Sequence, residues 1–150
     1  MGHCNNELWY FDTLSSTWHQ PPVTGPRPAA RAGCSAALLG NRWYVFGGGN
    51  NTAGCPDMWV MDLLQLGHGS ISWELCCTLD RQSALACEGA SAVAVPAFGA
   101  LVAFGGYNGT YHNVVSVFRP EEPSFLPDSA DLFAASAAGP RCATKYRLPG

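Results

Sequence analysis

Histidine and cysteine are the side chains of this sequence best suited to holding a metal or attacking a substrate, and the chain has four histidines and seven cysteines. The histidines His3, His19, His68 and His112 are far apart and fall on expected loops or at a strand end. No cysteines have the C-x-x-C spacing of a zinc site. The sequence therefore predicts no metal site and no cofactor.

Phosphate binding and nucleophilic or acid–base catalysis both lack the sequence motifs that they require. The stretch GGGNNTAG (47–54) is like a phosphate-binding loop, but neither the Gly-Lys-Ser/Thr sequence nor a helix follows it. The chain has no G-x-S-x-G nucleophile motif and no carboxylate pair at a spacing typical of acid–base catalysis. We therefore expect a protein that is not an enzyme.

Composition and charge indicate an ordinary globular chain. Hydrophobic residues make up 47% and charged residues 13%, and the net charge is −3. The basic residues are scattered, which excludes a nucleic-acid footprint. An odd number of cysteines and an N-terminus without the pattern of a signal peptide favour a reduced chain with buried free thiols, so the expected location is cytoplasmic.

The uncharged run GASAVAVPAFGALVAFG (89–105) is long enough to raise the question of a membrane helix. Pro96 and the glycines at 89, 99 and 105 argue against a helix. Two apolar strands joined by a Pro/Gly turn account for the same residues. The expected chain therefore has no membrane span.

A repeated sequence motif is the strongest indication of the fold. YVFGGGNN (44–51) returns as VAFGGYNG (102–109), and ELWYFDTLSSTW (7–18) is similar to DMWVMDLLQLGHGSISW (57–73). Alternating runs within each unit predict an all-β fold. The expected antiparallel strands are 34–39, 42–48, 57–63, 73–77, 90–95, 100–106 and 114–118, with Gly40-Asn41 as a tight turn in which both residues accept positive φ.

Four strands with a diglycine after the second, an acidic residue closing the third and a tryptophan opening the fourth resemble a kelch blade. GPRPAARAGCSAALLGNRWYVFGGGNN (25–51) and EGASAVAVPAFGALVAFGGYNGTYHNVVSVFRP (88–120) are further similar to the kelch domain of plant-type acyl-CoA-binding proteins. The similarity covers about residues 7 to 120. The sequence departs from it at LGHGS, which lengthens the middle unit, and at Arg119, where an aspartate is expected.

The resemblance implies a partial β-propeller of about two and a half four-stranded antiparallel blades over residues 1–120. A Pro/Ala-rich tail, linker or disordered segment follows over 121–150, and the chain is expected to be a piece of a longer protein. The residues with structural roles are the diglycines, which end the inner strands at φ > 0, two aspartates that bond to the following turn, and two tryptophans that pack one blade on the next. They are Gly47, Gly48, Gly105, Gly106, Asp12, Asp62, Trp18 and Trp73.

The function implied by the resemblance is a non-catalytic protein–protein interaction module. In that family a separate helical domain binds long-chain acyl-CoA esters for lipid transport. Nothing in these residues resembles that domain, and the single lysine is Lys145, so we expect no acyl-CoA binding by this chain. The alternative is a substrate adaptor of a ubiquitin ligase, and a kelch-type enzyme is less favoured. The partner and the total number of blades are not specified by the sequence.

In kelch domains the turn after the diglycine and the loop that enters the next blade share one rim. Tyrosine and arginine suit such a rim because they act as interface anchors. Asparagine belongs in turns in any case, and Arg31 could instead brace a strand. The expected partner-binding residues are Arg27, Arg31, Asn50, Asn51, Glu88, Tyr107, Asn108 and Tyr111.

An incomplete propeller has a consequence for stability. The first blade lacks its two inner strands and the third could lack its outer strand, which leaves edges and apolar faces without neighbours. Val93, Val95, Val102 and Phe104 are then expected to lose part of their burial. We therefore expect the isolated chain to be marginally stable and to self-associate or aggregate.

Overall fold

The computed structural model describes residues 3–50, 53–81, 83–120 and 141–147. The first part of the chain forms β1 (Tyr10–Asp12), β2 (Thr17–His19), β3 (Val23–Thr24), β4 (Ser35–Leu39), β5 (Arg42–Phe46), β6 (Asp57–Asp62) and β7 (Ile71–Thr78). The second part forms β8 (Ser91–Val95), β9 (Ala100–Phe104), β10 (Val114–Arg119) and β11 (Arg141–Arg147). The helical elements of the described residues are the 3-10 turns η1 (Leu63–Gln65), η2 (Ala84–Ala86) and η3 (Pro96–Phe98). The all-β prediction is confirmed.

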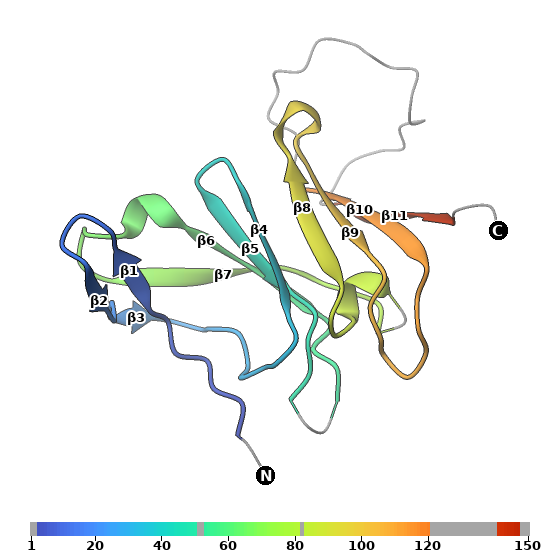
Figure 1. Ribbon diagram of the computed structural model, residues 1–150, viewed down its shortest axis with the longest axis horizontal. Helices are drawn as coiled ribbons and strands as arrows, with labels where there is room; N and C mark the ends of the chain where they lie inside the picture. Colours follow the sequence, from blue (N-terminus) through green and yellow to red (C-terminus); the bar gives the residue numbers. More distant parts are fainter. Residues whose placement is uncertain (1–2, 51–52, 82, 121–140, 148–150) are drawn as a thin grey trace.

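The strands form a hairpin and two larger sheets that stand side by side (Figure 1). We call β1–β2 the first unit, β4–β7 the middle unit and β8–β11 the last unit. Strand order is β3-β7-β6-β5-β4 in one sheet and β11-β10-β9-β8 in the other. Strands β4 and β8, which begin the middle and last units, lie against each other. All pairings are antiparallel except that of β3 with β7, so each unit is an up-and-down sheet.

Short turns join the first two strands of each larger unit. Leu39 pairs with Arg42 across Gly40-Asn41. Gly40 has a φ of 60°, whereas Asn41 is not among the residues at positive φ, so the expectation of positive φ at both positions holds only for the glycine. In the last unit, η3 and Gly99 (φ 56°) join β8 to β9. The uncharged run 89–105 therefore forms two strands and a turn, as predicted.

All seven expected strands are present, with ends that differ by one or two residues. Four strands lie outside that list: β1 and β2, which form the hairpin of the first unit, and also β3 and β11. The two-residue β3 pairs in parallel with the outer strand β7. Strand β11 pairs with β10 and completes the last unit, and it lies within residues 121–150, for which the sequence predicts a tail, linker or disordered segment. Residues 141–147 thus form a strand, and residues 121–140 lie outside the described part.

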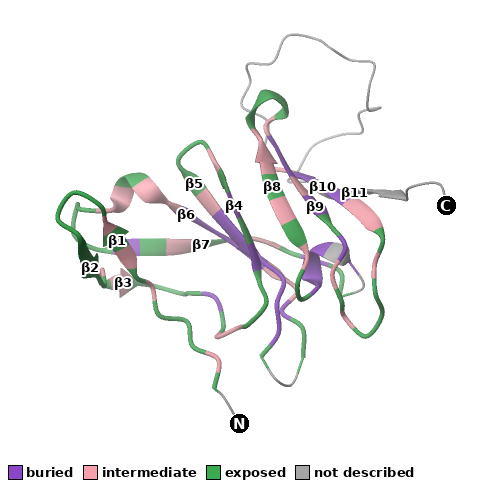
Figure 2. Cartoon of the chain, viewed as in Figure 1, coloured by how far each residue is buried: buried purple, intermediate pink, exposed green. Residues whose placement is uncertain are grey.

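The main core lies between the middle and last units. Tyr44, Phe46 and Met58 extend from one side of the middle sheet, and Leu101 and Phe118 meet them from the last sheet. The rings of Tyr44 and Phe118 make an edge contact with centroids 6.2 Å apart. Burial accordingly concentrates on β5, β6 and β9, while the first unit is largely exposed (Figure 2). Burial also raises the pKa of the Tyr44 hydroxyl.

The two tryptophans expected to pack one unit on the next make ring contacts within their own units. Trp18 is 66% exposed and contacts Phe11 of its own hairpin. Trp73 contacts Trp43 within the middle sheet, with ring centroids 5.5 Å apart. Cross-strand aromatic pairing within a unit is therefore their observed role.

The two aspartates do bond to the turns that follow them. The backbone N–H of Leu14 donates to Asp12 Oδ1 at 2.8 Å, and that of Leu64 donates to Asp62 Oδ1 at 2.9 Å. A further bond from the Ser15 hydroxyl, together with the Leu14 bond, lowers the pKa of Asp12. These side chains fix where β1 and β6 end.

No helix in the described part of the chain is long and apolar enough to cross a membrane. The six cysteines whose side chains are described form no disulfide, and Cys55 and Cys87 are buried. Burial raises the pKa of the Cys55 thiol, which keeps it in the protonated, unreactive form.

Candidate functional site

The loops that follow the diglycines and the loops that enter β4 and β8 meet at one end of the sheets, opposite the short turns (Figure 1). The N–H of Gly48 donates to the Cys87 carbonyl at 2.9 Å, and Ala32 pairs with Gly49. Glu88 pairs with Tyr107 through two backbone hydrogen bonds of 2.9 Å each. We call this end of the molecule the rim.

The glycines of the rim are required by φ and by space. Gly47 and Gly48 have φ values of 67° and 79°, and Gly105 and Gly106 have 76° and 95°. A Cβ on Gly47 would collide with the Cys87 carbonyl, and one on Gly106 would lie 2.6 Å from the Cβ of Cys87. The segment that enters the last unit therefore packs directly on the diglycines, which explains why both units repeat them.

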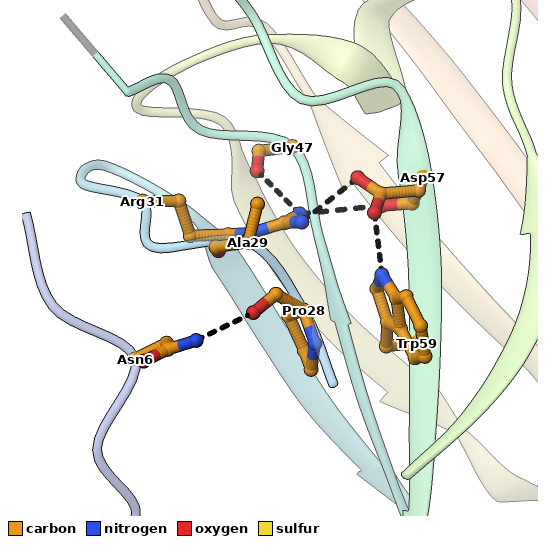
Figure 3. Close-up of polar contacts among 7 residues, drawn as sticks. All are labelled: Asn6, Pro28, Ala29, Arg31, Gly47, Asp57 and Trp59. Carbon is orange, nitrogen blue, oxygen red and sulfur yellow. Dashed lines mark hydrogen bonds and ion pairs between the residues drawn. The ribbon is translucent and has the colours of Figure 1, made fainter. Parts of the chain in front are cut away.

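Arg31 braces this arrangement from within (Figure 3). Its side chain is 4% exposed and makes an ion pair of 2.8 Å with Asp57 Oδ1. It also donates to the carbonyls of Ala29 and Gly47, each at 3.1 Å. Each of its three side-chain nitrogens donates to a group of this chain, so Arg31 joins the loop before β4 to the ends of β5 and β6, the bracing role that its sequence position also allowed.

Asp57 is held on its other side by Trp59, whose Nε1 donates to Oδ2 (Figure 3). Burial by itself would raise the pKa of Asp57. The hydrogen bonds from Trp59 and Arg31, together with the Arg31 charge, outweigh burial and hold that pKa below its ordinary value. Asp57 therefore stays ionised and serves the brace rather than acid–base chemistry.

An open hollow of about 620 Å³ lies on the rim between the middle and last units. Small residues form much of its floor, and Arg81, Glu88, Tyr107 and Asn108 supply its polar groups. Its walls come from four loops, those before β4, between β5 and β6, between β7 and β8, and between β9 and β10, so only the packed arrangement of the units creates it. The lining residues are Ala32, Gly49, Ala53, Gly54, Pro56, Arg81, Ala86, Glu88, Tyr107, Asn108 and Gly109.

One wall of the hollow continues outward as a row of three side chains. Tyr107 forms β-bridges to Glu88 on one side and to Tyr111 on the other. The rings of Tyr107 and Tyr111 are in contact, with centroids 4.9 Å apart. Tyr107 is 45% exposed and Tyr111 is 90% exposed. Of the predicted rim residues, these three are brought together on an accessible surface.

The other predicted rim residues are placed differently. Asn108 lines the hollow, but its amide donates to the Arg81 carbonyl at 3.0 Å and its Oδ1 contacts His112 Nε2 at 2.6 Å, so it shapes the loop. Asn50 Oδ1 accepts from the Ala53 N–H at 3.1 Å, a turn bond. Arg27 lies apart, at a second hollow of about 310 Å³ beside Pro22 and Val23. Asn51 lies outside the described residues.

Two residues that matter here were not singled out from the sequence. Arg81 lines the hollow, and Asp57 holds the brace. Asp57 opens a strand and precedes a continuous apolar run of four residues, which gave no sign of a buried ion pair. Among the described residues no three His, Cys, Asp or Glu side chains are close enough to hold a metal ion.

Comparison with known proteins agrees with this architecture. Residues 1–127 match the KLHDC2/KLHL20/DRC7 Kelch-repeats domain. The chain is 32% identical to acyl-CoA-binding domain-containing protein 4 of Arabidopsis thaliana over 125 residues, which are 82% of this chain and 18% of that protein. For protein 5 of the same organism the identity is 32% over 136 residues, which are 89% of this chain and 20% of that protein.

A third relative is animal: Kelch domain-containing protein 3 of Homo sapiens is 39% identical over 77 residues, which are 51% of this chain and 19% of that protein. The chain thus spans about a fifth of the length of the curated relatives it matches. The repeated diglycines, the four-stranded units and the match over 1–127 have one explanation: the chain belongs to the kelch-repeat family, and its sheets are blades of a partial kelch propeller.

Proposed function

We propose that this chain is a non-catalytic protein-binding module and that its partner docks on the rim at the hollow between the middle and last units. The observation that carries the proposal is the accessible row Glu88, Tyr107 and Tyr111 beside that hollow. Exposed tyrosines give large contact area at low entropic cost, which is the property of interface anchors. The chemistry of the hollow supports binding rather than catalysis, because the polar groups among its described lining residues include no nucleophile paired with a base.

The similarity to acyl-CoA-binding domain-containing proteins bears on the setting of this role. We propose that these residues recruit a protein partner in lipid metabolism, in the cytoplasm, and do not themselves hold acyl-CoA. In support, the hollow offers one cation, Arg81, among its described lining residues, whereas a nucleotide with several phosphates requires more positive charge.

Photo-cross-linking from two positions tests the proposal. A benzoylphenylalanine at Tyr111 samples the rim, and one at Phe98, which is 61% exposed on η3 at the opposite end, is the matched control. Cells that express each variant are irradiated, and the adducts are identified by mass spectrometry. We expect discrete adducts from position 111 that do not form from position 98.

The same adducts from both positions, or none from position 111, would overturn the docking site. Calorimetric titration of the chain with palmitoyl-CoA below its micelle concentration tests the second part. We expect no saturable heat, and micromolar binding would contradict the assignment of acyl-CoA binding to a separate domain.

A further inference from the structure

The β-bridges of Glu88, Tyr107 and Tyr111 determine the face to which their side chains point. The chemistry of this row can therefore be described in more detail than that of a general docking surface. Residues directly opposite each other in an antiparallel bridge point to the same face. Glu88 is opposite Tyr107, and Tyr107 is opposite Tyr111. One carboxylate and two aromatic rings therefore stand in line on one accessible face.

The carboxylate of Glu88 lies over Gly49. A Cβ at Gly49 would collide with Glu88 Oε1, so the absence of a side chain at this third glycine of the GGG run is what leaves room for it. Glu88 is exposed, and it takes part in neither of the ion pairs found among the described residues, Arg31–Asp57 and Arg42–Glu74. The carboxylate thus lies at the hollow with hydrogen-bonding capacity that neither of these ion pairs uses.

The aromatic part of the row complements the carboxylate. Tyr107 and Tyr111 touch at 4.9 Å between centroids and leave ring surface exposed. A ring face attracts a cation, and a planar guanidinium can stack on it while donating two hydrogen bonds to a carboxylate. An ammonium group can do only the electrostatic part of this.

We propose that Glu88, Tyr107 and Tyr111 form a subsite for an arginine side chain of the partner protein. The guanidinium donates to the Glu88 carboxylate and its plane lies on the tyrosine pair. This inference rests on the proposed docking role of the rim and names the chemistry of the partner residue that it receives.

Arg81 lines the same hollow, and its positive charge allows a basic partner residue to be distinguished from an acidic one. It raises the positive potential near the subsite, so it weakens the binding of an arginine and would strengthen that of an acidic or phosphorylated segment. Removing its charge therefore separates a basic partner residue from an acidic one.

The test uses fluorescence anisotropy with the full chain and three labelled peptides, Gly-Ser-Xaa-Ser-Gly, in which Xaa is arginine, citrulline or glutamate. Citrulline keeps the shape of arginine without its charge. We expect the arginine peptide to bind about fivefold more tightly than the citrulline peptide, as one partly exposed charge-assisted contact allows. The glutamate peptide should bind most weakly.

Three variants complete the test. Glu88→Gln should abolish the discrimination between arginine and citrulline. Tyr111→Ala, at a position that is 90% exposed, should weaken the arginine peptide about threefold, typical of an exposed cation–aromatic contact. Arg81→Gln should leave the binding of arginine unchanged or tighten it.

Equal binding of arginine and citrulline, discrimination that survives Glu88→Gln, or preference for the glutamate peptide would overturn the arginine subsite. Because the cross-linking from position 111 does not depend on any arginine, adducts that persist while the discrimination fails would overturn this inference alone. Loss of those adducts would instead overturn the proposed docking role.

Discussion

Phe46 and Phe104 hold the same place in two consecutive units of this chain, yet Phe46 is fully buried and Phe104 is 47% exposed. Each is the last residue of a second strand, opposite Ser35 or Ser91 on the first strand and opposite Met58 or Val115 on the third. Backbone pairing at the two positions is equivalent, so the difference in burial has another cause.

The same contrast extends over the whole face of each sheet. In the middle unit this face consists of Ala37, Tyr44, Phe46, Met58 and Val60, all buried. In the last unit the register places at the same positions Val93, Val102, Phe104, Val115 and Val117, none of which is buried, and Val93 is 57% exposed. We call these five the open face. Both faces are apolar; within the part of the chain that the structure describes, only the first has a neighbouring sheet against it.

The comparison teaches that a unit supplies an apolar surface but that its neighbour supplies the stabilisation. Burying a phenylalanine contributes about 1.5–3 kcal/mol only when the ring is fully removed from water. The expected loss of burial at Val93 and Phe104 is observed, and Val95 and Val102 are half-buried.

The largest expected effect concerns assembly. We expect residues 1–150 alone to self-associate through the open face, since a contiguous apolar surface of this kind seeks cover. Phe104→Lys should shift the sedimentation-velocity profile toward monomer, whereas Phe98→Lys, on the exposed η3 turn, should not. A monodisperse wild-type monomer that melts sharply above about 60 °C, high for a mesophile domain, would show that the open face needs no cover.

Truncating the two phenylalanines measures the contrast directly. We expect Phe46→Ala to lower the free energy of unfolding by about 3–5 kcal/mol, because it leaves a cavity in the core. Phe104→Ala should cost about 1 kcal/mol, because half of the ring is already in water. Urea unfolding of both variants under the same conditions provides the values, and equal losses would contradict the comparison.

The diglycines provide a second matched pair. Gly47→Ala must accommodate a positive φ and a collision with the Cys87 carbonyl, at a cost of about 3 kcal/mol. Gly105→Ala has a similar φ, but its nearest neighbour, the His112 carbonyl, would be 3.5 Å away, an ordinary contact. We expect about 1–2 kcal/mol there. Thermal melts of the two variants should differ accordingly; a larger loss at Gly105 would count against close packing at the middle unit.

The Arg31–Asp57 brace is present in the middle unit, and Cys87 and Val114 stand at the matching positions of the last unit. Arg31→Ala should destabilise the chain by about 2–3 kcal/mol, because it leaves a partly buried carboxylate without its cation. The exposed pair Arg42–Glu74 is the control, and Arg42→Ala should change stability by about 0.5 kcal/mol or less. Equal losses of unfolding free energy for Arg31→Ala and Arg42→Ala in chemical unfolding would contradict a stabilising role for the Arg31–Asp57 pair.

The smallest effect is a pH dependence carried by Asp57 of the middle unit, whose matching position in the last unit is the non-titrating Val114. The pKa of Asp57 is lowered in the folded chain, so its ionised form contributes stability that is fully present above its unfolded pKa of about 3.9. That stability is lost as the pH falls through the folded pKa. Asp57→Asn should therefore flatten the decline in stability below about pH 4. An unchanged slope in acid urea titrations would argue against the lowered pKa.

Much of the local structure was predictable from residue types. Alternating apolar residues located seven strands, and Asp62 and the Pro96–Gly99 turn marked where strands end. Strand β3 was not predicted because a strand of two residues is too short to show an alternating pattern. Strand β11 was missed because its pairing with β10 bridges a long separation in sequence that no local pattern records.

For the candidate site, the sequence determined the repeat, the all-β class and which loops carry Glu88, Tyr107 and Tyr111, since these follow from strand period and turn chemistry. Tertiary structure alone decided that those three stand in one row while Arg31 turns inward to Asp57, and that Phe46 is buried while Phe104 is not. The physical reason is that burial and side-chain pairing depend on what the neighbouring sheet brings against a surface, and equivalent residues in repeated units do not share their neighbours.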